Sequence, residues 1–594
     1  MVKSDRLEDI DSTYTDNGSR TGGVGARRHL GSIIALVAVA LLFLLPSVFA
    51  QTPVKTAASA KTKVATPQQK KVLRLTPQIP HANRNQPGKV FLERADRLSR
   101  EDDPNKDYQV LSGNVVFRKQ GMFMYCDSAH FFDQENSLIS YGNVKMQQGD
   151  TLFAFADEMH YDGKGELVTL KGYDGKEVEL INRKVHLFSD SLHYNMLTGI
   201  GYYDTGGLIQ DEENELESVR GQYNTHTKNA DFDYSVELRN AKFTLNTEKL
   251  KYNTDSHIAN IVSKTDIVNT QDNSRIVTSN GWYNTSLESS EMYDRSTVYD
   301  KDGGTLTGDT LFYDKRADYG EAFGNMELYD YKNKCILKGD YGFHDNLHNE
   351  SFTTGHALAM EFSQADTLYL HADTIRTYVD MVDTTRVMHG FRGVRFFRKD
   401  VQGLCDSLAF TARDSLLRMH YHPHVWNENK QITGNIIHVH LNDSTVDWAR
   451  LPQYGMVAES LGEEFYNQLT GKEMYATFDH GKMRHLDVSG NVQVIMLPAE
   501  NDSTYNKLVN AESSYLKADF LNNTIEKLVM WPEVTGSAIP LFQVKNSDRY
   551  LNGFSWQSDA RPKDPKDVMT VPESMVAIMH QAEKKVGRTQ RMSK

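Results

Sequence analysis

A marker of one aromatic residue followed by Asp or Asn recurs through this chain at a nearly fixed interval. The aromatic residues are 29 to 33 residues apart, at Phe132, Tyr161, Tyr194, Tyr223, Tyr252, Tyr283, Tyr313 and Phe343, the last being followed by His344. A second phrase keeps the same step, because Gly113-Asn114-Val115 returns as Gly142-Asn143-Val144. A period of about 30 residues predicts a stack of similar supersecondary units, each burying its apolar face against its neighbours.

The repeating unit is predicted to consist of β-strands. Between Met122 and Ala129 the side chains alternate between two faces, which is the period of a strand. Gly-Asn and Gly-Asp pairs recur between such segments, and these residues tolerate the positive φ of tight turns. No proline occurs between Pro104 and Pro423, where average usage would give roughly 16. Because proline cannot donate a ladder hydrogen bond, its absence favours an extended sheet.

The composition is that of a folded, soluble protein. Of 594 residues, 39% are hydrophobic and 24% charged, which is too apolar for a disordered chain. The formal net charge of -13 argues against nucleic acid as the main partner, since phosphate binding needs a surplus of Lys and Arg.

The first 86 residues are predicted to lie outside the repeats. Arg27-Arg28-His29 precede an apolar run from Ile33 to Leu45, and small residues end at Ala50. This pattern predicts a signal peptide over residues 1–50, cleaved after Ala50, with an uncleaved anchor as the alternative. Residues 51–86 are rich in Lys, Thr, Ala, Gln and Pro without periodicity, so a flexible linker is expected there.

Three consecutive β-repeat segments are expected, at 87–265, 266–450 and, with weaker copies, 451–560. The polar stretch from Lys264 to Arg275 fits either a long hairpin or a segment boundary.

Elsewhere the pattern changes. The marker is lost between Leu451 and Lys472, which favours a longer loop or a joint. In the tail at 561–594, Thr570 and Glu573 form a potential capping box before apolar residues at helical spacing. One short amphipathic helix is therefore expected near Glu573 to Lys585.

The chain has three cysteines, Cys126, Cys335 and Cys405. Cys126 and Cys405 occupy the same phase of the repeat, 279 residues apart. In a stack of strands about 4.8 Å apart they would be far beyond the reach of a disulfide. All three are predicted to be buried free thiols.

The residues that could carry chemistry recur too regularly to form an active site. An Asp returns at each repeat, whereas catalysis needs one constellation of unlike groups, so the Asp residues are interpreted as turn formers. His420, His422 and His424 alternate, as do His438 and His440, but neither set completes a recognised metal site. No catalytic activity, metal or cofactor is predicted.

The densest basic group within the repeats contains Arg392, Arg395 and Arg398. Guanidinium groups match phosphate, so these residues are candidate contacts for an anionic lipid headgroup. The alternative is a solvated edge strand that uses charge to prevent aggregation.

The ordered phrases Tyr141-Gly142-Asn143-Val144, Ala156-Asp157 and Tyr161-Asp162 resemble those of the OstA-like (organic solvent tolerance) family. The resemblance is clearest over 110–254 and returns at Thr433-Gly434-Asn435-Ile436. It implies an all-β, elongated, incomplete β-jellyroll, in which two antiparallel sheets lie over an open groove that shields acyl chains. The family includes a periplasmic lipopolysaccharide-transport protein and a domain of its outer-membrane partner.

This resemblance leads us to expect a non-catalytic, exported lipid-binding bridge in the periplasm, at the periphery of the outer membrane. The expected partners are lipopolysaccharide or a similar lipid with several acyl chains, and other transport proteins joined by end-to-end strand pairing. Phe123, Phe153 and Phe155 are the candidate inward-facing lipid contacts. A structural or adhesive β-solenoid and a β-helical carbohydrate-active enzyme remain alternatives.

Overall fold

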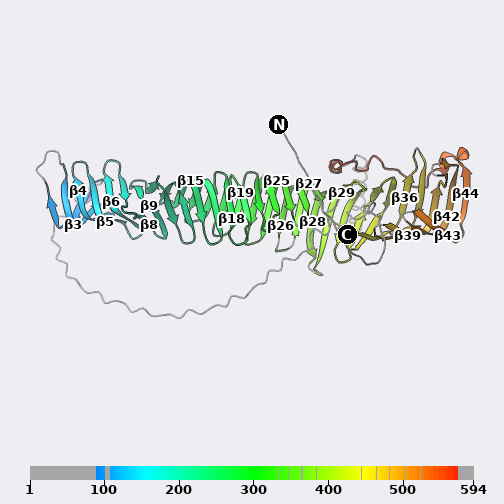
Figure 1. The fold of residues 1–594 in the computed structure, drawn as a ribbon, viewed down its shortest axis with the longest axis horizontal. Coiled ribbons are helices and arrows are strands. Elements are labelled where there is room, and N and C mark those ends of the chain that lie inside the picture. The colour runs from blue at the N-terminus through cyan, green and yellow to red at the C-terminus, as the bar shows by residue number, and fades with distance from the viewer. Residues whose placement is uncertain are drawn as a thin grey trace, which may run out of the picture.

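A computed structural model describes residues 88–572, except 101–106, 332–333, 346, 349, 363–365, 381, 383, 443–444, 463, 481, 502–503, 522–523 and 571. The described chain is all-β and forms a long row of antiparallel strands that lie across the long axis of the molecule (Figure 1). The expected all-β, elongated class is thus confirmed. The predicted signal peptide, linker and tail helix lie outside the described residues.

The strands of the N-terminal half are β1 (Phe91–Arg94), β2 (Arg97–Ser99), β3 (Gln109–Lys119), β4 (Met122–Phe132), β5 (Ser137–Gln148), β6 (Leu152–Asp162), β7 (Leu167–Lys171), β8 (Val178–Asn182), β9 (Val185–Ser189), β10 (Ser191–Asn195), β11 (Ile200–Tyr203), β12 (Gly207–Gln210), β13 (Glu215–Ser218), β14 (Arg220–Asn224), β15 (Asn229–Arg239), β16 (Phe243–Asn253), β17 (Ile258–Ile261), β18 (Thr265–Asn269), β19 (Arg275–Thr278), β20 (Gly281–Asn284), β21 (Ser289–Met292), β22 (Ser296–Tyr299), β23 (Thr305–Gly308) and β24 (Thr310–Asp314).

The remaining elements are β25 (Tyr319–Asp330), β26 (Cys335–Asp345), β27 (Glu350–Glu361), β28 (Leu368–Asp380), β29 (Thr385–Arg398), β30 (Val401–Thr411), β31 (Leu416–His420), β32 (His424–Asn427), β33 (Lys430–Gly434), β34 (Ile436–Asn442), β35 (Thr445–Leu451), β36 (Gly455–Ser460), β37 (Tyr466–Gly471), β38 (Glu473–Asp479), β39 (Lys482–Met496), β40 (Ala499–Asn501), β41 (Thr504–Tyr505), β42 (Lys507–Leu521), β43 (Thr524–Trp531), β44 (Thr535–Pro540) and three short 3₁₀ turns, η2 (Leu541–Gln543), η3 (Asn546–Asp548) and η4 (Asp567–Met569).

The strands form two sheets that share their longest members. One half of β6 pairs with β8 and the other half with β7, so β6 belongs to both sheets. We call the sheet that begins with β1 and contains β8 sheet I, and the sheet that begins with β2 and contains β7 sheet II. Sheet I ends at β44 and sheet II at β43, and both of these strands pair with β42.

The long strands bend between the sheets at a recurring β-bulge. In β3, β5, β25 and β39 the bulge is a Gly-Asn pair with both residues at positive φ, as at Gly142 (74°) and Asn143 (45°). Opposite the bulges of β3, β5 and β25 an Asp accepts a hydrogen bond from the Asn side chain, as Asp127 does from Asn143 at 2.7 Å, whereas Lys472 lies opposite the bulge of β39. A Cβ on Gly142 would lie 2.6 Å from the Asp127 carboxylate. The recurring Asp residues therefore fix this bent edge, which we call the corner.

The Asp or Asn that follows the aromatic residue of the sequence marker stabilises the hairpin turns on the edge opposite the corner. In the turns that follow the six tyrosines from Tyr161 to Tyr313, the Asp or Asn side chain accepts backbone N–H donors two and three residues ahead, as Asn253 does from Asp255 (3.1 Å) and Ser256 (2.9 Å). Asp162, Asn195, Asn224, Asn284 and Asp314 make the same contacts. The turn-forming role predicted for these residues is confirmed, and it rests on local hydrogen bonds.

Apolar side chains from both sheets meet in one continuous core that runs from Val90 to Ala518. Phe117 of sheet I and Phe131 of sheet II contact each other across it, with ring centroids 5.5 Å apart. Cys126, Cys335 and Cys405 are buried and free, as predicted, and burial raises the pKa of each thiol.

Strand pairing continues through both expected segment boundaries. Thr265 to Thr278 form the hairpin β18–β19, and β35 pairs with β38 beyond residue 450. The stretch from Leu451 to Lys472 contains β36 and β37. The described part of the chain contains no helix of the length and hydropathy needed to span a membrane.

After β44 the chain folds back over the outer face of sheet I, toward the middle of the stack (Figure 1). We call residues 541–570 the strap. Gln468 holds it by donating to the Arg549 carbonyl (2.7 Å) and accepting from the Leu551 amide (2.8 Å).

One repeat earlier in the stack the same clamp returns. Gln431 donates to the Ser555 carbonyl and accepts from the Gln557 amide, both at 2.8 Å. Gln402 then accepts from the Arg561 guanidinium at 2.8 Å. Because of the strap, both faces of sheet I are covered between β29 and β37.

Candidate functional site: the apolar interior and its bridged edge

The interior between the sheets is the candidate site. Met122, Met124, Leu152 and Ala154 of β4 and β6 point into it, and all four are buried. Along the stack most inward side chains are buried in one continuous cluster, and partly buried apolar side chains pack against it, so in this structure side chains fill the space between the sheets. The sequence predicts an open groove; the structure shows instead an apolar interior of the same length that is packed.

The lipid contacts proposed from the sequence lie on the other face of the same strands. Phe123 and Phe155 are 36% and 38% exposed, and Phe153 is partly exposed. Lys145 lies over the Phe153 ring, 5.3 Å from its centroid, on the outer surface. The prediction that these three residues face inward is therefore wrong. It failed because β4 and β6 carry apolar residues on both faces, so alternation alone does not indicate the inner one.

A column of tyrosines lines the interior beside the turns of sheet II. It consists of the central members of the sequence marker, namely Tyr161, Tyr194, Tyr223, Tyr252, Tyr283 and Tyr313. Burial raises the pKa of every one of them, to about 12 at Tyr313. The two end members differ, since Phe132 and Phe343 point to the outer face. The inner position on β26 is occupied by His344, which pairs with Gly320 opposite Tyr313.

The turns of sheet I and sheet II meet along the edge opposite the corner, and polar contacts join them there. We call this edge the seam and these contacts the seam bridges. Most bridged residues lie 41 to 48 residues apart in sequence, which brings each sheet I turn to a later turn of sheet II. Between Gly88 and Lys315 six such bridges are described.

The first three bridges are formed by Asn136, Lys119 and Asn182. Asn136 in the β4–β5 turn accepts from the Val90 amide (2.8 Å) and donates to the Gly88 carbonyl (2.7 Å). Lys119 at the end of β3 binds Glu166 and the Tyr161 hydroxyl. Asn182 at the end of β8 donates to the Thr225 carbonyl at 2.9 Å.

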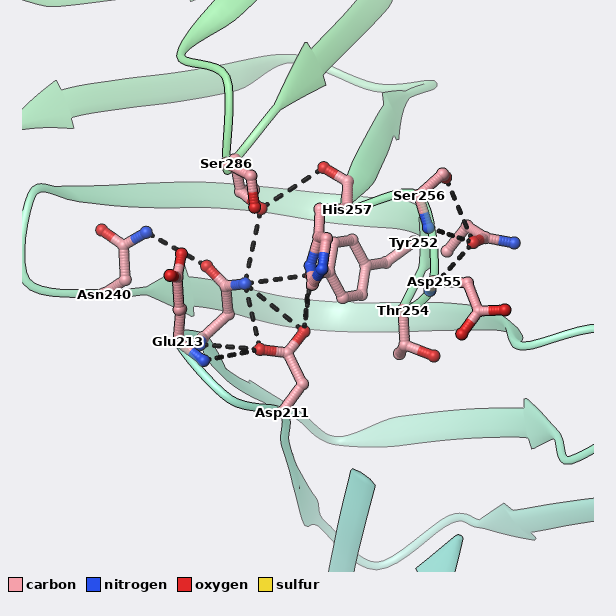
Figure 2. Close-up of polar contacts among 12 residues, drawn as sticks. Asp211, Glu213, Asn240, Tyr252, Thr254, Asp255, Ser256, His257 and Ser286 are labelled. Carbon is pink, nitrogen blue, oxygen red and sulfur yellow. Dashed lines mark hydrogen bonds and ion pairs between the residues drawn. The ribbon is translucent and has the colours of Figure 1, made fainter. Parts of the chain in front are cut away.

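The fourth bridge contains the largest number of polar groups (Figure 2). The Tyr252 hydroxyl of β16 donates to Asp211 in the β12–β13 turn at 2.6 Å and accepts from Asn214 at 3.0 Å. His257 Nδ1 lies 3.3 Å from the same hydroxyl. Figure 2 shows Asp211, Tyr252 and His257 converging on one point. Asn214 also reaches Thr285 Oγ1 of the β20–β21 turn at 3.4 Å, so this bridge joins three turns and a strand.

Lysine–carboxylate pairs form the last two bridges. Lys242 Nζ lies 2.6 Å from Glu288 Oε1, and Lys315 Nζ lies 2.8 Å from Asp272 Oδ2. Burial alone would raise the pKa of Asp272, but the hydrogen bonds from Lys315 and Ser274 outweigh it and lower the pKa to about 2. Asp272 therefore remains ionised in the physiological range.

The structure does not bring the three candidate headgroup arginines together. Arg395 is buried under the strap, where it donates to the carbonyls of Ala560 (3.3 Å) and Asp567 (3.2 Å). Arg398 is buried and pairs with Asp400 through two hydrogen bonds, at 2.5 and 2.8 Å. Only Arg392, at the bulge of β29, is exposed. The prediction that these three residues form a shared headgroup site is therefore wrong, because two of the three guanidinium groups already bind protein oxygens.

The histidines are likewise separated. His420 and His438 lie on the outer face of sheet II, on β31 and β34, whereas His424 lies on β32 of sheet I. Burial lowers the pKa of all three. Within the described ranges no group of three or more His, Cys, Asp or Glu side chains is arranged to hold a metal ion.

The C-terminal end of the stack exposes both last strands. On β43 the side chains of Ile525, Leu528, Val529 and Trp531 are exposed, and β43 and β44 are each described as paired with β42 alone. The N-terminal edge is shorter, because β1 and β2 contain only four and three residues.

Residues 87–248, which extend from this N-terminal edge into β16, match a family model described as OstA-like protein. This part of the chain is similar to the OstA-like family. The family is generally a non-enzymatic transport family with periplasmic members, and the match indicates a β-structure of the lipopolysaccharide-transport type. No curated protein matches the chain.

The seam bridges were not anticipated from the sequence. The sequence marker indicated only one side of these contacts, because tyrosine, which has a hydroxyl group, rather than phenylalanine fills the inner positions. The partners could not be found, because they lie one and a half repeats away and differ in chemistry from bridge to bridge.

Proposed function

We propose that this protein is a non-catalytic bridge that carries lipopolysaccharide, or a similar lipid with several acyl chains, through the periplasm toward the outer membrane. The observation that carries the proposal is the uninterrupted apolar interior from Val90 to Ala518, in a chain whose first repeats are OstA-like. An interior that runs the length of the stack can accept acyl chains at any position and pass them along.

The physical basis of binding is the burial of methylene groups. Each CH₂ transferred from water contributes about 0.8 kcal/mol. Methionines such as Met122, Met124 and Met159 line the opening repeats, and their flexible side chains can repack around a guest. Since the interior is filled, a lipid must separate the sheets to enter, and its own contacts then replace those between the sheets.

The ends of the stack support the proposed partners. The edge formed by β43 and β44 offers unpaired backbone groups and exposed apolar side chains, which suits the addition of a strand from another transport protein. Export by the N-terminal signal and residence at the periphery of the outer membrane belong to the same proposal.

Photo-cross-linking in living cells tests the lipid assignment. A photoreactive residue at Met124, which faces inward, is expected to capture lipopolysaccharide, whereas one at the neighbouring Phe123 is not. The two sites share one strand, so the comparison isolates the face. Capture at Phe123, Phe153 and Phe155 instead would place the lipid on the outer surface. No capture at either face, together with unchanged outer-membrane lipid after depletion, would refute transport.

A structural rod is the second candidate function, and the packing of the interior favours it. Side chains such as Leu111, Phe117 and Leu138 have no exposed surface, as in an ordinary core. In that case depletion would weaken the envelope without altering the lipid content of the outer membrane.

A further inference from the structure

We propose that the seam is the entrance to the interior and that the seam bridges hold it shut. The proposal rests on the proposed function for what passes through the entrance, but opening at the seam can be measured without any lipid. The bridges concerned are those of Lys119, Asn136, Asn182, Asp211 with Asn214, Lys242 and Asp272.

The two long edges differ in how the sheets are joined. At the corner the backbone itself passes from sheet II to sheet I in strands such as β3 and β5, and the Gly-Asn bulges are fixed by Asp side chains. Separating the sheets there would break strands. At the seam each of the six bridges depends on at least one side chain, so the sheets can separate while every strand keeps its ladder.

The chemistry of the bridges also fits a reversible closure. Every bridge joins polar groups at the rim of an apolar interior, and a group released there moves toward water rather than into the core. A pair of this kind contributes little net free energy, because solvation replaces most of what is lost. An apolar rim in the same place would have to expose its surface to water on opening.

Lys119 is the most informative bridge. Its side chain has no exposed surface, it lies over the Tyr161 ring at 4.8 Å, and its charge is neutralised by Glu166. A lysine at an inward-facing position of β3 is costly for a permanent core, where an apolar residue would pack without desolvation. Placed at the rim, the same lysine can seal the edge and release it.

The test uses the protein's own thiols. The Cys126 side chain on β4 faces the interior near the N-terminal end of the stack. The Cys405 side chain on β30 faces the same interior much farther along the stack. In the full chain, the triple variant Lys119→Ser, Asn182→Ser and Asn214→Ser removes the side-chain contacts of three bridges and leaves the rim polar. We expect its Cys126 to react with a maleimide about tenfold or more faster than in the unaltered chain, since each lost hydrogen bond shifts an opening equilibrium several-fold.

Cys405 and Lys145→Ser provide the controls. Lys145 is a lysine of the same opening repeats, but it lies on the outer face over Tyr125 and Phe153. Its replacement should leave the labelling of Cys126 unchanged. Cys405 should stay slow in every variant. An unchanged Cys126 rate in the triple variant, or an equal rise at Cys405, would overturn the proposal, the second because the bridges would then support the whole stack.

Lipid capture at Met124 separates this proposal from the transport function. Faster Cys126 labelling with stronger lipid capture supports both. Faster labelling without any capture, including in the unaltered chain, supports the entrance and refutes lipid transport. Lipid capture that is insensitive to the bridges, with unchanged labelling, leaves transport intact and overturns the entrance.

Discussion

Tyr252 shows why the recurring aromatic residue is tyrosine in the middle of the stack. Its ring belongs to the apolar core, while its hydroxyl reaches Asp211 and Asn214 across the seam. A phenylalanine would fill the same volume and leave those two polar groups without this partner. At the residue scale, then, one side chain serves both the packing of the interior and the closure of its edge.

Replacing Tyr252 with Phe is expected to lower the free energy of local opening around β16 and β17 by about 1–3 kcal/mol, because Asp211 and Asn214 stay partly buried. Hydrogen exchange of the amides in these strands measures the effect. Tyr223→Phe is the matched control, since its hydroxyl contacts the neutral side chains of Asn182 (3.4 Å) and Thr254 instead of a carboxylate, and its effect should be smaller. Equal effects would contradict the role given to the fourth bridge.

The Asp272–Lys315 bridge is expected to lose its contribution in acid. The pKa of Asp272 is lowered from 3.8 to about 2, so the folded state favours the ionised form. The stabilisation is full above pH 4 and disappears as the pH falls toward 2. Unfolding measured between pH 2 and 5 should show a shallower pH dependence for Asp272→Asn than for the unaltered chain. Identical slopes would show that the pair does not act in this way.

At the scale of single elements, the bulged strands and the strap are the two devices that shape the stack. The bulge depends on residues that are close in sequence. Two residues at positive φ, together with one Asp on the neighbouring strand, direct a strand from one sheet into the other. The strap is distant: its clamps join residues 83 to 126 positions apart, between Gln468 and Leu551 and between Gln431 and Gln557.

Gly142→Ala is expected to destabilise the corner by more than Gly149→Ala. Both glycines have positive φ, at 74° and 64°, so both variants carry the same backbone strain of roughly 1 kcal/mol. Only at Gly142 would the new Cβ also collide with Asp127; around Gly149 the space is open. Urea denaturation of the two variants compares them directly. A larger loss at Gly149 would contradict the bulge geometry.

Gln431→Leu is expected to release the strap above β32 and β33. The substitution removes both backbone clamps, to Ser555 and Gln557, and the partner of the Trp426 indole N–H at 3.0 Å. Trp426, which is fully buried, should become accessible to a fluorescence quencher, and the strap to protease. Gln493→Leu, at an exposed position of β39 bonded to Glu512, is the control and should change neither.

On the scale of the whole molecule, each repeat contributes two strands to each sheet and contacts its immediate neighbours. Stability in such a stack is approximately a sum of repeats and interfaces, so its length is adjustable. The marker positions from Tyr161 to Tyr313 define where one repeat can replace another, because each of these markers begins a turn with the same side-chain cap.

Deletion of residues 224–252 tests this directly. It removes 29 residues and joins Tyr223 to Asn253, so that the remaining chain keeps its marker and loses β15 and β16. We expect a folded protein whose longest dimension, by small-angle X-ray scattering, is about 10 Å shorter. Deletion of 224–238, which breaks the phase, should aggregate. Equal behaviour of the two variants would contradict the repeat register.

Much of this architecture could be predicted from the sequence, because the interactions that form it join residues that are close together in the chain. The turn caps of Asn253 and its equivalents act within three residues, and the bulge is written as Gly-Asn, so a period of 30 residues shows both. The inner face could not be assigned, because Met122 and Phe123 are both apolar. The strap contacts and the burial of Arg395 were invisible, since they depend on partners more than 100 residues away.

The strap also has a mechanical consequence. An added layer that is bonded along one face of a sheet makes the sheet harder to bend. The strap is such a layer, because it is hydrogen-bonded to sheet I at Gln468, Gln431 and Gln402. It acts there as a splint, so that flexing of the strands against one another is restrained from β29 to β37. The unsplinted repeats before β28 are then the compliant part of the rod. A molecule that must span a gap of varying width would take up the variation in that part.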